Sequence, residues 1–228
     1  MRHASCVMRL VDASQARRLD QISESLGVST QQLMRQAGEA IAQLLARLTK
    51  PKEGPIVFFV GKGNNGGDGR IAAKYLEKKN YSVTVMDEKS KPAMRAAALK
   101  KANWIVDGLL GTGLNGEVRG WMEKAIAEIN KAATLGKKVL AIDIPSGLSA
   151  DTGKPLGAAV RATVTACLGA AKLGCVLFPG MEYAGRIEVL DIGIPKKAYS
   201  MAALNYRLLT ADDILYIVIV QTVAGCNK

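Results

Sequence analysis

Short apolar runs of strand length alternate with helix-length segments over most of this chain, and that alternation restricts the fold more than any other feature. Residues 55–60 (PIVFFV) are apolar throughout, as expected of a parallel strand that helices cover on both faces. Strands joined through helices need crossover connections, which produce a mainly parallel sheet between layers of helix. The remaining strands are predicted at residues 81–86, 104–106, 139–142, 162–168 and 186–190, and the helices between them at residues 71–79, 93–101 and 121–133.

Two amphipathic helices are predicted ahead of the first strand. Apolar residues at helical spacing, followed by the left-handed stop that Gly27 supplies, predict the first helix. Ser29 with Gln32 forms a capping box that opens the second helix, whose apolar stripe runs over residues 33–48. At 228 residues the chain is long enough for one sizeable core, so we expect a single domain over residues 1–228.

Composition excludes several kinds of chemistry. The one histidine is His3, so the body of the fold has no imidazole for a Ser-His-Asp or Cys-His relay or for a multi-histidine metal site. The formal net charge of +11 favours an anionic partner, which could be nucleic acid, an acidic membrane surface or a phosphorylated small molecule. Lysines are spread along the chain, which is more typical of a solvated face than of a dedicated binding arm.

The cysteines predict a reducing compartment. They have no metal-ligand spacing and lie among apolar residues, as buried free thiols do. The first twenty residues contain no continuous apolar stretch, and no apolar run approaches the roughly 18 residues of a membrane span. We therefore expect neither a secretory signal nor a membrane segment, and a cytoplasmic protein. The cysteines are Cys6, Cys167, Cys175 and Cys226.

A glycine-rich segment follows the first strand of the predicted sheet. Gly61, Gly63 and Gly66 satisfy the G-x-G-x-x-G pattern, and Asp87 lies where an acid that binds a ribose would be expected. Glycines let backbone amides approach a ligand, and the following helix would offer its positive end to a phosphate. The alternative is a tight turn that binds nothing. A Walker phosphate loop is excluded because no Gly-Lys-Ser/Thr follows.

Polar side chains also follow the later strands. Asp107 closes one apolar strand, and Asp143 closes the next, with Ser146 three residues on. Because ligands of parallel sheets collect at the carboxyl ends of the strands, we expect these residues to meet Asn65 and Asp68 at one edge. Oxygen donors without sulfur or imidazole suit a hard cation, either monovalent or alkaline-earth. The alternative is a hydrogen-bonded network that only orders the loops.

These motifs together resemble those of the NAD(P)H-hydrate epimerases, whose domain also occurs fused to a dehydratase. The resemblance covers about residues 10–212 and leaves a tail at 213–228. It rests on segments 63–69 (GNNGGDG), 106–113 (VDGLLGTG), 116–119 (GEVR) and 143–148 (DIPSGL), and continues through 150–153 (ADTG), Lys172, 179–180, 191–195 (DIGIP) and, near the start, 19–20, Gly27, 33–34 and 37–38.

The resemblance implies a Rossmann-like three-layer α/β/α sandwich, interconversion of the R and S forms of hydrated NADH and NADPH, a potassium ion and a homodimer. Potassium would be held by Asn65, Asp107 and Ser146. The small-molecule dinucleotide substrate would be contacted by Asn64, Asn65, Gly66, Gly67, Asp68, Gly111, Thr112, Gly113, Leu114, Asn115, Gly116, Glu117 and Asp143.

The reaction needs an acid/base group beside the hydroxyl at C6 of the nicotinamide ring. Loss of that hydroxyl to a ring-stabilised cation, or reversible ring opening, erases the stereocentre, and either route needs electrostatic support. Asp143 is our first candidate for this group and Asp68 our second. Lys172 either binds the phosphates or balances charge in the site, and the alternative is a surface lysine without a role.

The sequence departs from the family pattern in several places. Most relatives have an additional strand before the Asp107 segment, whereas here only a helix-length stretch, residues 88–103, follows the second strand. A missing strand would expose a neighbouring strand edge and alter how the adenosine end is held. Ser149 replaces a common Asp, and residues 35–36 replace an acidic-led pair. The chain ends where fused relatives continue into a dehydratase, so we expect no ATP- or ADP-dependent dehydration, and its apolar tail would pack on the core or mediate self-association.

Two other functions stay open at this level. One is an NAD(P)-dependent dehydrogenase, which the glycine pattern suggests, and the other is a non-catalytic nucleotide- or RNA-binding scaffold of the same fold. Nucleic acid is disfavoured because only 5% of the residues are aromatic and no stacking motif is present. Converging carboxylates favour catalysis over a scaffold. The preference between NADH and NADPH hydrate is not determined by the sequence.

Overall fold

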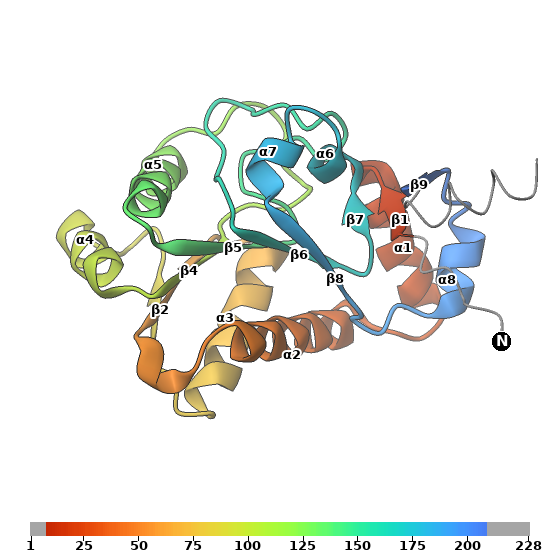
Figure 1. The fold of residues 1–228 in the computed structure, drawn as a ribbon. Coiled ribbons are helices and arrows are strands. Elements are labelled where there is room, and N and C mark those ends of the chain that lie inside the picture. The colour runs from red at the N-terminus through yellow and green to blue at the C-terminus, as the bar shows by residue number, and fades with distance from the viewer. Residues whose placement is uncertain (1–7, 209–228) are drawn as a thin grey trace, which may run out of the picture.

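The computed structural model of the protein describes residues 8–208, and its centre is a parallel sheet (Figure 1). Within these residues the main sheet has six strands in the order β3-β2-β4-β5-β6-β8, and every neighbouring pair is parallel. The prediction of a mainly parallel three-layer α/β/α fold is therefore confirmed. The strands are β2 (Ile56–Val60), β3 (Val83–Met86), β4 (Trp104–Gly108), β5 (Lys138–Ile142), β6 (Val164–Leu168) and β8 (Arg186–Leu190).

Helices cover both faces of the sheet, which explains why the central strand β2 is apolar at every position. In β2, Phe58 packs into one core with helices α2 and α3, while Val57 and Phe59 pack into a second core with α4 and α5. All three side chains are fully buried. The helices on the first face are α2 (Thr30–Leu48) and α3 (Asn64–Glu77), and those on the second are α4 (Pro92–Lys101) and α5 (Trp121–Thr134) (Figure 1).

The start of α3 differs from the prediction. The helix begins at Asn64, inside the glycine-rich segment, and not near residue 71. A Cβ atom on Gly66 would lie 2.1 Å from the carbonyl oxygen of Gly61, and one on Gly69 would lie 3.0 Å from Val60. The glycines therefore let the first turns of α3 lie directly against the end of β2, a long-range packing effect that local helix propensity does not report.

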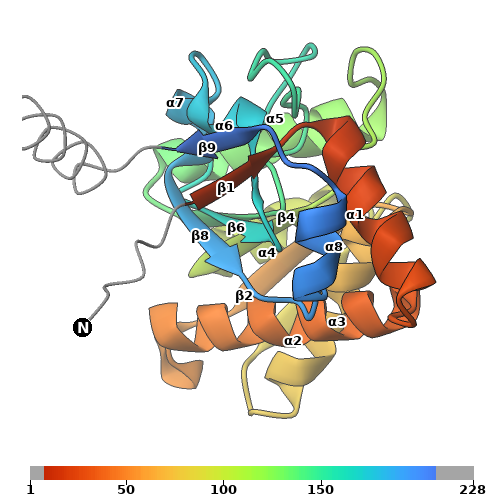
Figure 2. The ribbon, with the colours of Figure 1, turned by 90° about the vertical axis from the view of Figure 1, so that its right-hand side faces the viewer.

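A second, smaller sheet lies beside the first and was not predicted. Its strands run β7-β1-β9, with β1 parallel to β7 and antiparallel to β9. Figure 1 labels the three strands, and Figure 2 shows β1 beside β9. The register places Val11 opposite Lys172. This sheet joins the beginning of the described chain to the segment that follows β6. The strands are β1 (Met8–Val11), β7 (Ala171–Lys172) and β9 (Tyr206–Leu208).

Helix α1 (Ala13–Ser25) follows β1 and packs beside α8 (Lys196–Met201) (Figure 2). Asp12 caps α1 and Ser29 caps α2, each through a capping box, and the second of these was predicted. Gly27 has the predicted left-handed conformation, with φ of +88°. The short elements are η1 (Pro51–Glu53), α6 (Leu173–Val176) and α7 (Met181–Ala184).

Strand β3 forms an edge of the main sheet, and only α4 connects it to β4 in the part of the chain that the structure describes. Val85 of this edge strand is 40% exposed.

Cys167 and Cys175 are buried free thiols, as predicted. None of the helices within residues 8–208 is both long and apolar enough to cross a bilayer. The predictions for His3, Cys6, Cys226 and the tail at 213–228 lie outside the described residues.

Candidate active site

A cavity of about 580 Å³ opens at the carboxyl ends of β2, β4, β5 and β6. The N-terminus of α3 and the loop after β4 form part of its wall. Helices α1 and α2, the end of β6, the small strands β1 and β7 and the segment after β8 also contribute. Its location is the one expected for a ligand of a parallel α/β sheet. The predicted site residues that line it are Asn64, Asn65, Asp68, Gly111, Thr112, Gly113, Leu114, Asn115 and Asp143.

Four predicted contact residues do not line the cavity. Gly66 and Gly67 lie in α3, where a Cβ atom on Gly67 would lie 2.7 Å from the sulfur of Met34. These two glycines therefore serve packing of the helix. Gly116 has a left-handed backbone conformation, and Glu117 is exposed and pairs with Arg119. Both lie beyond the part of the loop that reaches the cavity.

The N-terminus of α3 lies at the wall of the cavity. Gly63 is the N-cap residue, and no side chain from the described residues caps this end of the helix. Gly63, Asn64 and Asn65 all line the cavity. An uncapped helix N-terminus carries partial positive charge and free donors, which suit a phosphate group.

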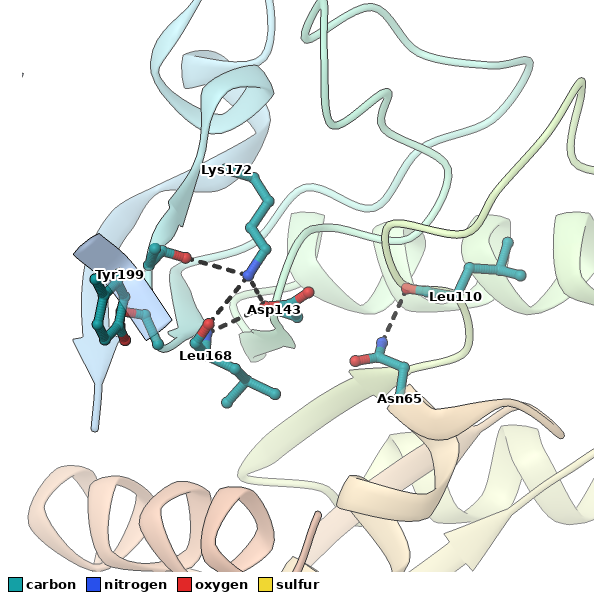
Figure 3. A network of polar contacts seen from close by, with 8 residues as sticks. Asn65, Leu110, Asp143, Leu168, Lys172 and Tyr199 are labelled. Atoms are coloured by element: carbon teal, nitrogen blue, oxygen red, sulfur yellow. Dashed lines mark hydrogen bonds and ion pairs between the residues drawn. The ribbon is translucent and has the colours of Figure 1, made fainter. Parts of the chain in front are cut away.

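The three predicted potassium ligands meet around the backbone of Leu110. The Asn65 Nδ2 donates to the Leu110 carbonyl over 2.9 Å (Figure 3). The Leu110 N–H donates to Ser146 Oγ over 2.9 Å. Ser146 in turn donates to Asp107 from its hydroxyl over 2.6 Å and from its backbone N–H over 2.8 Å. The structure thus brings together residues from α3, β4 and the segment after β5.

Asp107 is fully buried in this network. Burial raises its pKa to about 6, although hydrogen bonds from Ser146 and Leu109 favour the charged form. The described residues contain no group of three His, Cys, Asp or Glu side chains that could hold a metal ion. The oxygen set around Leu110 has a single carboxylate beside amide, hydroxyl and carbonyl oxygens, a donor set that fits a hard cation of low charge.

Asp143 and Lys172 form a buried ion pair at the inner wall of the cavity (Figure 3). The Lys172 ammonium donates to Asp143 Oδ1 and to the carbonyl oxygens of Leu168 and Ala170, over 3.2 and 3.1 Å. Lys172 is only 3% exposed, so the alternative of a plain surface lysine was wrong. Burial opposes its charge, but Asp143, together with Cys167 and Cys175, more than compensates and raises the pKa of Lys172.

The charges of both members of that pair act on Asp68. It is 6% exposed, and burial raises its pKa to about 8, with further increases from Asp143 and Asp20 that Lys172 partly offsets. A carboxyl group with such a pKa holds its proton at neutral pH, as a general acid must. The two aspartates that the sequence predicted therefore line one cavity in different surroundings. Asp143 is bonded to Lys172, whereas burial raises the pKa of Asp68.

Asp20 was missed as a site residue. It projects from α1 to the cavity rim, where loss of hydration raises its pKa, with Lys172 opposing and Asp143 reinforcing the shift. In the sequence Asp20 is a polar residue on an amphipathic helix, and nothing local distinguishes it from a solvent-facing acid. Only the position of α1 over the carboxyl ends of the strands brings it to the site.

The model of the family described as "YjeF-related protein N-terminus" matches residues 30–103 and 86–174 of this chain. The chain is 33% identical over 221 residues to the NAD(P)H-hydrate epimerase of Pirellula staleyi, covering 83% of this chain and 95% of that protein. It is 34% identical over 236 residues to the bifunctional NAD(P)H-hydrate repair enzyme Nnr of Moorella thermoacetica, covering 90% of this chain. Of that longer enzyme the chain spans 44%.

The fold also matches a known crystal structure, that of yeast ynu0, with a TM-score of 0.70 at 19% sequence identity. The match covers 90% of this chain and 98% of the yeast chain. At this identity the likeness concerns the fold alone, and the sequence matches carry the assignment. The chain therefore belongs to the family of YjeF-related protein N-terminal domains, which its glycine-rich and aspartate-containing motifs predicted.

Proposed function

We propose that this protein is an NAD(P)H-hydrate epimerase, an isomerase that interconverts the R and S forms of hydrated NADH and NADPH. The observation that carries the proposal is the placement of two aspartates, Asp68 and Asp143, in one cavity with an uncapped helix N-terminus. The proposal is supported by family membership and by the name of the Pirellula staleyi relative, nearly all of whose length the chain spans.

In the proposed complex the dinucleotide lies along the cavity from α3 to the ion pair. The N–H groups at the start of α3 and the backbone of residues 111–115 would bind its phosphates. The nicotinamide ring would then reach Asp143 and Asp68, which line the cavity beside the apolar side chain of Leu168. This placement leaves the reacting carbon next to groups that can move a proton.

The interconversion of the two epimers consumes no reactant other than the water that it releases and takes up again. The C6–O bond breaks with its electron pair, the leaving oxygen takes a proton and departs as water, and the ring nitrogen forms a double bond to C6. Water then adds to either face and returns the proton, so both epimers form. An acid is needed for the leaving oxygen and a negative charge for the cationic ring, and the cavity offers carboxyl groups for both tasks.

We propose a potassium site at Asn65, Asp107 and Ser146, next to the Leu110 carbonyl. The donor set described above suits this ion, which would supply a fixed positive charge and neutralise the buried carboxylate of Asp107. These residues would order the loop after β4, which forms one wall of the cavity.

The activity is tested directly from a single epimer. Pure S hydrate is incubated with the protein and potassium chloride, and the R form is followed by chromatography that resolves the two. We expect conversion well above the spontaneous rate, with no change in the nicotinamide absorbance band. A rate equal to the spontaneous one at high protein concentration would refute the epimerase assignment, and net oxidation or reduction of an added substrate would indicate the dehydrogenase instead.

We further propose a cytoplasmic homodimer. The buried free thiols Cys167 and Cys175 suit a reducing compartment, and the family resemblance supports the dimer. Light scattering coupled to size-exclusion chromatography measures the mass of the protein, and a monomeric mass at micromolar concentration would contradict the homodimer. Cell fractionation tests the cytoplasmic location.

A further inference from the structure

The ammonium group of Lys172 has all of its hydrogen-bonding capacity in use. A lysine ammonium has three donors, and here they contact Asp143 Oδ1 and the carbonyl oxygens of Leu168 and Ala170. It therefore has no donor left for a substrate. Lys172 therefore acts on the reaction by holding Asp143 and through its charge, and not by a hydrogen bond to the substrate.

The same contacts fix Asp143. Its Oδ1 also accepts from the Leu168 N–H over 3.1 Å, and its own N–H donates to the Ala166 carbonyl over 2.8 Å. Asp143 has a left-handed backbone, with φ of +68°, which turns its side chain away from the line of β5. Within the described residues Oδ2 has no hydrogen-bond partner. One oxygen is thus held by the protein, and the other is left for the cavity (Figure 3).

The small sheet provides the support that this arrangement needs. Burying an ammonium is costly unless it is paired and hydrogen-bonded. Strand β7 pairs with β1, which places Lys172 opposite Val11 and fixes the backbone from which the side chain reaches Asp143. The residues that bond to the ion pair therefore come from β6 and the turn between β6 and β7, and β1 supports that turn by pairing with β7.

Several carboxyl groups share one cation at this point of the cavity. Lys172 interacts with Asp20, Asp68 and Asp143, and the other cationic residues that line the cavity are Arg17 and Lys62. The other titratable groups that interact with Lys172 are Cys167 of β6, Cys175 of α6 and Tyr199 of α8. Of the carboxyl groups only Asp143 is hydrogen-bonded to Lys172. Like charges at short range favour retention of a proton by a member that lacks this bond.

From this geometry we propose that Lys172 is a positioning residue, which holds Asp143 as the anionic group of the site and thereby leaves Asp68 to carry the exchangeable proton. The inference rests on the proposed function. Asp68 donates the proton to the C6 hydroxyl, which leaves as water, and the Asp143 carboxylate stabilises the cationic ring. Addition of water to the opposite face returns the proton to Asp68. The raised pKa of Asp68 agrees with this division.

The kinetic test is a double-mutant cycle between Lys172→Met and Asp143→Asn. Lys172→Met should lower kcat about a hundredfold or more with little change in KM, because the substrate keeps its contacts while the reacting carboxylate loses its orientation. In the Asp143→Asn background, Lys172→Met should lower kcat by less than about threefold. An equal decrease in kcat in both backgrounds, or a change in KM alone, would overturn the proposal.

A second measurement does not depend on activity. The carboxyl carbon of Asp68, assigned by its absence in Asp68→Asn, is titrated by NMR in the wild-type protein and in Asp143→Asn. Because the Asp143 carboxylate that Lys172 holds raises the pKa of Asp68, removal of that charge should move the midpoint below the wild-type value of about 8. An unchanged midpoint would refute the electrostatic part of the proposal even if the wild-type protein proves inactive, whereas an inactive protein with the expected shift would refute only the epimerase function.

Two further variants separate positioning from folding. Lys124→Met removes the same charge from an exposed position on α5 and should leave kcat unchanged. Lys172→Met combined with Asp143→Asn removes both charges of the pair, so it should unfold at a higher temperature than Lys172→Met alone while remaining inactive. Recovered activity in that double variant would contradict the proposed role of Asp143.

Discussion

The hydroxyl of Ser146 donates a 2.6 Å hydrogen bond to Asp107 and so joins the segment after β5 to the end of β4. The Leu110 N–H donates to the same hydroxyl, which extends the connection to the loop that forms one wall of the cavity. The carboxyl ends of two neighbouring strands are thus one hydrogen-bonded unit. Substitutions in this unit should change the stability of the protein and its response to potassium, whereas substitution of the proton-transfer groups should change the rate of epimerisation.

Asp143→Asn should slow epimerisation by about a hundredfold or more, because general acid–base and charged groups at a reacting centre typically contribute about 10²–10⁴. The amide keeps the shape of the side chain but cannot carry the negative charge that faces the ring. The rate is measured from pure S hydrate by chromatography. Glu123→Gln, an exposed change on α5, is the matched control. Wild-type rates in Asp143→Asn would remove this residue from the mechanism.

Asp68→Asn should flatten the dependence of stability on pH. In the folded protein the pKa of Asp68 is about 8, against 3.8 for an ordinary aspartate in the unfolded chain, so between these values the folded state binds more protons than the unfolded state. The free energy of unfolding therefore falls as pH rises through this window, by on the order of 4 kcal/mol in the wild type. Urea titrations at pH 5 and pH 8 should show a smaller fall in the variant, and equal falls would contradict the raised pKa.

Gly66→Ala should destabilise the protein by about 1–3 kcal/mol or more, although alanine favours helix. Its Cβ would lie 2.1 Å from the backbone oxygen of Gly61, which cannot move as a side chain can. Gly63→Ala is the comparison, since no described atom lies within 4 Å of the added carbon. We expect it to cost less than about 1 kcal/mol, as a change at a helix N-cap. Urea denaturation measures both, and a reversed order would show that α3 begins elsewhere.

Potassium chloride should raise the unfolding temperature relative to tetramethylammonium chloride at equal ionic strength, because an ion that binds only the folded state stabilises it by mass action. Ser146→Ala should lose most of this difference, whereas Ser25→Ala, which removes only a local hydroxyl bond to Ile22 on α1, should keep it. Differential scanning calorimetry gives the temperatures. Identical values for the wild type in both salts would argue against the potassium site.

Much of the site could be predicted before the structure was known. Asp107 and Asp143 each end an apolar run, and the rule that strand ends of a parallel sheet share one edge was enough to group them with Asn65 and Asp68. The rule does not say which glycines touch a ligand. Gly66 and Gly67 have the same local signal as Gly63, but their lack of a side chain is needed for packing of α3.

The sequence by itself determined the succession along the chain of the main-sheet strands and the helices between them, the capping box at Ser29 and the aspartates at the strand ends. Apolar periodicity and cap chemistry act over a few neighbouring residues, which is why these features could be predicted. Tertiary structure alone decided that Lys172 is buried against Asp143, 29 residues away, and that Asp20 of α1 faces them both. Charge and burial at these positions depend on which distant segments pack together, and the small sheet that brings these segments together has no sequence signal of its own.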